Sequence, residues 1–120
     1  MQFDVERSTV AGRPALTVRG ELDLSTAPHL DAAAEQLVAA SREFVVDLTP
    51  TTFLDSSGAR TLLGLAKRTE SAGGHLTVLA QRSKGPVRLT LDLLDLGAYL
   101  SLVGSAGEIA TGVAGRDAGS

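Results

Sequence analysis

The chain has 120 residues, of which 43% are apolar and 21% charged, and a formal net charge of −3. This composition is typical of one folded globular domain, which at this length buries roughly two-thirds of the surface that its unfolded chain exposes. The charge deficit and the aromatic content of 3% argue against nucleic acid as a partner, because nucleic-acid binding needs a surplus of Lys and Arg and usually exposed stacking faces. The same deficit argues against an acidic membrane as a partner.

The sequence contains no cysteine, which excludes disulfides, thiolate metal sites and a cysteine nucleophile. No stretch is long and apolar enough to span a bilayer, and Met1 is followed by Gln2-Phe3-Asp4 rather than by a basic region and an apolar run. A Walker-type loop and a dinucleotide fingerprint are also absent from the sequence. We therefore expect a cytoplasmic protein that holds no cofactor or metal and is not an enzyme.

The N-terminal part of the chain predicts two strands, a helix and a third strand. Residues 3–10 and 15–20 are expected to form a β-hairpin around residues 11–14, because apolar side chains alternate in the second run. Apolar residues then recur at helical spacing over residues 25–40, with a proline in the first turn. The unbroken apolar run from residue 44 to residue 48 is typical of an interior strand.

The remaining sequence predicts further helices alternating with strands. The expected elements are a loop at 49–54, a helix at 57–72 with Ala59, Leu62, Leu63 and Ala66 on its core stripe, a stop at Gly73-Gly74, a strand at 76–80, a helix capped by Ser83 and ending near Gly97, a strand at 99–103 and a helix at 105–113. The order β-β-α-β-α-β-α-β-α implies an α/β domain with a mixed sheet of four to five strands and about four helices. We assign this domain to residues 1–114 and a flexible C-terminal tail to residues 115–120.

The segment Asp55-Ser56-Ser57-Gly58 lies between an apolar strand and an amphipathic helix, which makes it the most informative part of the sequence. Backbone N–H groups at a helix start lack partners and attract oxygen-rich or anionic groups, so a phosphate on Ser56 would be well placed there. The segment is also a good capping sequence, and capping contributes ~1 kcal/mol of stability without any further function. The segment alone does not decide between these two interpretations.

Six short segments, taken together, indicate a protein family more specifically than residues 55–58 alone. They are, in chain order, Gly20-Glu21-Leu22-Asp23, Thr26-Ala27-Pro28, Val46-Asp47-Leu48, Phe53-Leu54-Asp55-Ser56-Ser57-Gly58, Gly73-Gly74 and Val87-Arg88-Leu89. In this order and spacing the chain resembles the bacterial anti-sigma factor antagonists of the STAS superfamily (sulfate transporter and anti-sigma factor antagonist domains). The resemblance covers most of the chain and implies a single STAS-like domain.

The resemblance implies that Ser56 is the phosphorylation site and that Asp55, Ser57 and Gly58 surround it at the start of the helix. It implies that the unphosphorylated protein binds an anti-sigma factor that is also a serine kinase, which frees a sigma factor, and that phosphorylation reverses this binding. A phosphatase of the PP2C type would restore the active form. The partner-binding residues that we predict on this basis are Asp23, Thr26, Ala59 and Arg60; the last two follow Gly58, where family members often have a leucine.

Other readings of the sequence remain open. His29 and His75 lie apart and are assigned surface or capping roles, and a serine-hydrolase elbow is missing around Ser56. Arg60, Lys67 and Arg68 form either a basic strip that faces an acidic partner or an ordinary solvated face. The alternative functions are a scaffold subunit of a larger signalling assembly, which a size measurement would distinguish from the monomer or weak dimer expected of an antagonist, and a small-ligand-binding STAS module.

Overall fold

The computed structural model describes residues 2–40, 42–83 and 85–111, and its sheet begins with a β-hairpin. Strands β1 (Asp4–Val10) and β2 (Arg13–Leu22) pair antiparallel around a turn at Ala11-Gly12, with φ values of 52° and 77°. Positive φ at both central residues is the geometry of tight hairpins, and glycine adopts it without strain. The predicted hairpin is confirmed, with a shorter turn because pairing continues through Arg13 and Pro14.

The other strands run parallel to β2. Strands β3 (Glu43–Asp47), β5 (His75–Leu79) and β6 (Ser101–Val103) extend the sheet in the order β1-β2-β3-β5-β6. The interior strand expected at 44–48 is confirmed, because Phe44, Val45 and Val46 are at most 1% exposed. The α/β class and the mixed sheet are confirmed as well.

A further strand, β4 (Thr51–Leu54), lies where the sequence predicted a loop, and that prediction is wrong. This strand pairs parallel with the end of β2, beyond a register shift between Gly20 and Glu21. Gly20 has a φ of 91°, which permits this irregularity. The described residues therefore contain six strands rather than four to five. A four-residue strand whose partner is about thirty residues away leaves little local periodicity to detect.

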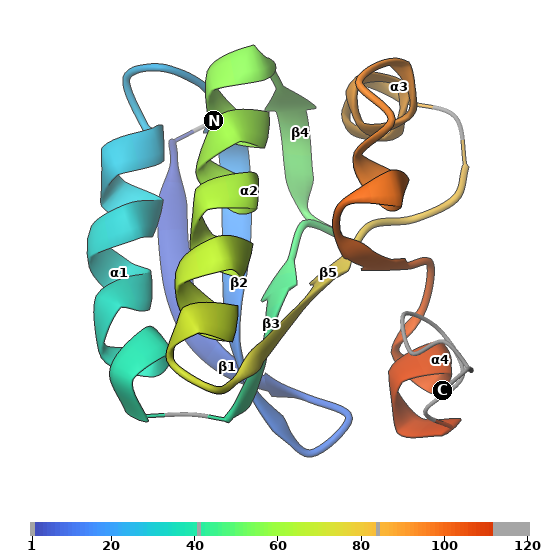
Figure 1. Cartoon of the computed structure of the whole chain (residues 1–120). Coiled ribbons are helices and arrows are strands. Elements are labelled where there is room, and N and C mark those ends of the chain that lie inside the picture. Colours follow the sequence, from blue (N-terminus) through green and yellow to red (C-terminus); the bar gives the residue numbers. More distant parts are fainter. Residues whose placement is uncertain (1, 41, 84, 112–120) are drawn as a thin grey trace.

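Four α-helices occur within the described ranges. They are α1 (Ala27–Ala40), α2 (Ser56–Ser71), α3 (Pro86–Leu93) and α4 (Ala106–Thr111), with a short 3₁₀ helix η1 (Leu96–Ala98) after α3. Figure 1 shows α1 and α2 side by side across one face of the sheet. Gly85, rather than Ser83, occupies the N-cap position of α3, and no side-chain hydrogen bond is made from it. The helix ends before Gly97, because Asp95 turns into the left-handed region.

The main core lies between the sheet and helices α1, α2 and α3. Helix α2 buries Ala59, Leu62 and Leu65, whereas Leu63 and Ala66, which we predicted on the core stripe, are only partly buried against it. A second cluster, formed by Ala15, Val45, Leu79, Val103 and Ile109, packs α4 against the opposite face of the sheet.

The ends of the predicted helices can be compared only in part. Helix α2 ends as predicted, since Gly73 has a φ of 87° and the Gly74 N–H donates to the Thr69 carbonyl at 2.9 Å. The predicted end of the last helix, the domain boundary at residue 114 and the tail at 115–120 lie outside the described residues.

Candidate functional site

The candidate site is the junction at which β4 passes into α2. Leu54 ends β4, and the Asp55 backbone N–H donates to the carbonyl of Leu22, the last residue of β2, at 3.3 Å. Because β2 and β4 are parallel, their carboxyl ends lie at the same edge of the sheet. The loop that follows β2 and the first turn of α2 therefore meet there, and the structure brings together two of the sequence segments selected above.

Asp55 is the N-cap of α2, and neither serine has that role. Its backbone is extended (φ −107°, ψ −174°), and its carboxylate accepts a hydrogen bond from the Gly58 N–H at 2.9 Å. Ser56 is the first residue of the helix and is exposed, whereas Ser57 is half-buried. The capping interpretation therefore applies to Asp55 and leaves the Ser56 hydroxyl accessible.

At Gly58, helix α2 packs closely against the ends of β2 and β4. A Cβ atom at this position would lie 2.6 Å from the Leu22 carbonyl oxygen and 2.6 Å from Leu54 Cδ1. Leu22 and Leu54 are both fully buried, so neither can easily move away. The sequence analysis placed Gly58 at the helix start but missed this contact. The signal for it was that the segments 20–23 and 53–58 both belong to the pattern selected above.

Asp23 and Thr26, two predicted partner contacts, organise the loop before α1. The Asp23 carboxylate accepts hydrogen bonds from the Ser25 hydroxyl at 2.8 Å and the Ser25 N–H at 3.0 Å. The hydrogen bond from the Ser25 hydroxyl is the main cause that lowers the pKa of Asp23 below its ordinary value. The Thr26 hydroxyl donates to the Glu21 carbonyl at 2.7 Å. Both side chains hold the loop in shape next to the start of α2, and their contact with a partner remains a prediction.

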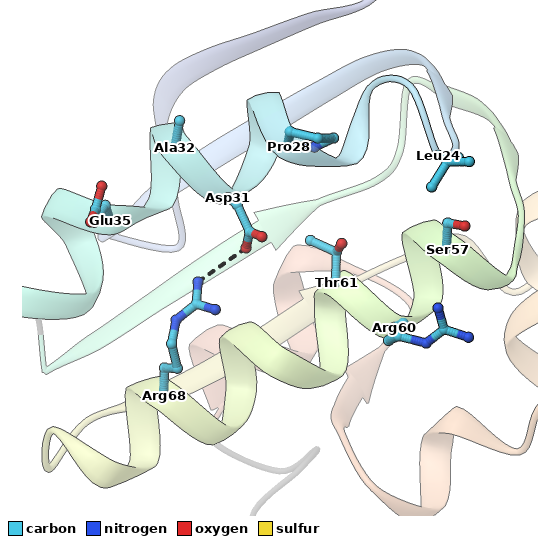
Figure 2. A pocket seen from close by; sticks show the side chains of 9 residues that line it. All are labelled: Leu24, Pro28, Asp31, Ala32, Glu35, Ser57, Arg60, Thr61 and Arg68. Carbon is cyan, nitrogen blue, oxygen red and sulfur yellow. Dashed lines mark hydrogen bonds and ion pairs between the residues drawn. The ribbon is translucent and has the colours of Figure 1, made fainter.

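An open groove of about 650 Å³ runs between α1 and α2 beside this junction. Figure 2 shows the side chains that line it, with Ser57 and Thr61 of α2 on the side of Leu24 and α1, and with Arg60 extending toward the N-terminal end of α2. Leu24 is 74% exposed, and Phe53, which precedes the junction in β4, is 41% exposed.

The predicted basic strip on α2 is only partly free to meet a partner. Arg60, Lys67 and Arg68 are all exposed, but Arg68 pairs with Asp31 of α1 at 3.0 Å. Ala59 is buried in the core and offers no side chain to a partner surface. Of the two residues after Gly58 that were predicted to contact a partner, the structure therefore leaves Arg60 exposed and places Ala59 inside.

The two histidines have local partners. The His29 ring lies 6.0 Å from the Phe3 ring, and His75 shares a hydrogen bond of 2.8 Å with the Ser101 hydroxyl. Within the described ranges, no three His, Asp or Glu side chains gather closely enough to hold a metal ion. None of the helices in this part of the chain has the length and hydropathy needed to cross a membrane.

The mixed sheet, the helices on its two faces and the exposed serine at the start of α2 define a small α/β domain with an accessible hydroxyl at one edge of its sheet. The chain belongs to the STAS family, because its residues 5–104 match the family model described as "Mlab, STAS domain".

Solved structures of similar proteins agree with this assignment. An anti-sigma factor antagonist from Mycobacterium paratuberculosis is 26% identical, with a TM-score of 0.80 over 93% of this chain and 94% of that one. The unphosphorylated form of the anti-sigma factor antagonist SpoIIAA is 20% identical, with a TM-score of 0.68 over 92% of this chain and 95% of that one. SpoIIAA of Bacillus in its phosphorylated form is also 20% identical, with a TM-score of 0.61 over 92% of this chain and 98% of that one. A search of curated proteins found no match.

Proposed function

We propose that this protein is an anti-sigma factor antagonist that binds an anti-sigma factor with serine kinase activity and is inactivated when that partner phosphorylates Ser56. The unphosphorylated protein then releases a sigma factor, and a PP2C-type phosphatase restores it after phosphorylation. Membership of the STAS family and the similarity to the mycobacterial antagonist support the general role. The protein itself carries out no catalysis in this scheme and works in the cytoplasm as a monomer or weak dimer.

The main support for Ser56 as the modified residue is the separation between capping and exposure at the junction. The Asp55 carboxylate caps α2 through the Gly58 N–H, so Ser56 can be modified without removing the cap. Ser56 is exposed, whereas the neighbouring Ser57 is half-buried beside the groove. A kinase therefore reaches the Ser56 hydroxyl more readily than that of Ser57.

The expected loss of binding follows from the added charge. A phosphoserine carries about −1.5 to −2 charges at neutral pH, and here it would be added at the junction of two segments that expose the apolar side chains of Leu24 and Phe53. A hundredfold loss of affinity requires only ~2.7 kcal/mol. Removing water from a new dianion at a contact shaped for a hydroxyl can cost that amount without any refolding of the domain.

The test is phosphorylation by the anti-sigma factor kinase that co-purifies with the tagged protein from its native host. Incubation with ATP and mass spectrometry should show one phosphate on the parent and on a Ser57→Ala variant, and none on Ser56→Ala. The phosphorylated parent should bind the kinase at least tenfold more weakly than the unmodified protein. Equal phosphorylation of Ser56→Ala and the parent would overturn the assignment, and equal affinity of both forms would overturn the charge mechanism.

A further inference from the structure

Arg60 lies one helical turn after Ser56 on α2. Side chains four residues apart are neighbours on a helix surface, with about 5–6 Å between their Cβ atoms. Helical side chains also lean toward the N-terminus of their helix. Figure 2 shows Arg60 directed toward the N-terminal end of α2, on the side of Ser57. The guanidinium therefore lies within reach of a group attached to the Ser56 oxygen.

The guanidinium of Arg60 makes no ion pair with the described residues. Within residues 2–40, 42–83 and 85–111, no carboxylate lies within ion-pair distance of it, although Asp31 and Glu35 of α1 line the same groove. Asp31 is paired with Arg68 at 3.0 Å, and the Asp55 carboxylate caps the helix. Arg60 is thus the cation of the groove that is available to a new anion.

We propose that Arg60 binds the phosphate on Ser56 as an ion pair within α2, and that phosphorylation thereby withdraws Arg60 from the groove. This inference rests on the proposed function for the phosphate on Ser56. An anion four residues N-terminal to a cation is the favourable order on a helix, and phosphoserine offers three strong acceptor oxygens to a guanidinium. Phosphorylation then changes the contact surface twice, because it adds a dianion and removes a cation that an acidic partner would use.

The experiment places phosphoserine at position 56 during translation, through an expanded genetic code, and follows its titration by ³¹P NMR. A nearby cation lowers the pKa of the phosphate, so Arg60→Gln should raise that pKa, with an increase in proton affinity of about twofold for a pair of this type. Lys67→Gln removes the same charge from an exposed position on the same helix and should leave the titration unchanged, because eleven residues along a helix span about 16 Å, beyond the Debye length at physiological salt.

An unchanged titration in Arg60→Gln, or an equal change in Lys67→Gln, would overturn the ion pair. Arg60→Lys should retain part of the effect, since it keeps the charge and loses the planar fork of donors. The unphosphorylated Arg60→Gln protein should unfold at the same urea concentration as the parent, because Arg60 is exposed. The phosphate is installed without a kinase, so a kinase that ignores Ser56 would overturn the proposed function and not the ion pair.

Discussion

Replacement of Gly58 by alanine tests whether the close contact between α2 and the sheet holds the junction together. The added Cβ would lie 2.6 Å from a backbone oxygen of Leu22 and 2.6 Å from Leu54 Cδ1, well inside normal contact distance. Because the Leu22 oxygen belongs to the backbone of a buried strand, the first turn of α2 would have to move outward. The Asp55 cap and the orientation of Ser56 would move with it.

The expected cost follows from two opposing effects. Overpacking a filled core typically costs ~1–3 kcal/mol, whereas alanine in place of glycine in a helix gains up to ~1 kcal/mol. The net prediction for Gly58→Ala is a loss of about 1–2 kcal/mol in the free energy of unfolding. With an m-value of roughly 1–2 kcal/mol per molar urea, the unfolding midpoint should fall by about 1 M.

Gly64→Ala on the same helix is the matched control. Only the Arg68 guanidinium comes near a Cβ at that position, at 3.9 Å, which is an ordinary contact. The propensity gain is then unopposed, and Gly64→Ala should stabilise the protein by about 0.5–1 kcal/mol. Urea unfolding monitored by circular dichroism measures both variants. If Gly58→Ala were as stable as Gly64→Ala, the close contact would not constrain the junction and the steric reasoning would be refuted.

Three further predictions concern charged groups. Asp55→Ala should lose ~1 kcal/mol of stability and Asp55→Asn much less, because asparagine also caps helices. The bidentate pair with Arg82 lowers the pKa of Glu108 from 4.5 to about 2. The contribution of this pair to the free energy of unfolding is therefore complete above pH 4.5 and disappears as the pH falls toward 2. Glu108→Gln should make stability less dependent on pH in that window, measured by acid unfolding. Asp31→Asn, which breaks the exposed pair with Arg68, should change stability by less than about 0.5 kcal/mol in urea titrations.

Local patterns in the sequence predicted most of the fold. Helix α1 is found where the helical spacing of apolar residues put it, and β3 matches the unbroken apolar run. Both elements are long or strongly patterned, so tertiary contacts reinforce the local preference. Strand β4 was missed because its pairing partner is the far end of β2, beyond the register shift between Gly20 and Glu21. A contact of that range cannot be recovered from the four residues of β4 themselves.

The candidate site was predicted through its residue types, while the division of roles among them needed the structure. The sequence identified residues 55–58 as a good capping segment, and the hydrogen bond to the Gly58 N–H assigns the cap to Asp55. The sequence also grouped Ala59 with Arg60 as partner contacts, although one is in the core and the other is exposed. Adjacent helix residues point in directions about 100° apart, and which of them meets the sheet depends on how α2 docks.

Asp55 and Gly58 meet the structural needs of the junction, and Ser56 takes no part in meeting them. Its side chain is exposed and makes no hydrogen bond within the described part of the chain. The free energy of unfolding of Ser56→Ala should therefore differ from that of the parent by less than about 0.5 kcal/mol, although the variant would no longer accept phosphate. A much larger loss in the free energy of unfolding, measured in urea, would show that the hydroxyl stabilises the fold. It would then weaken the argument that Ser56 serves regulation. Equal stability would mean that the Ser56 hydroxyl is not needed for folding, which supports a role for Ser56 as a site of modification.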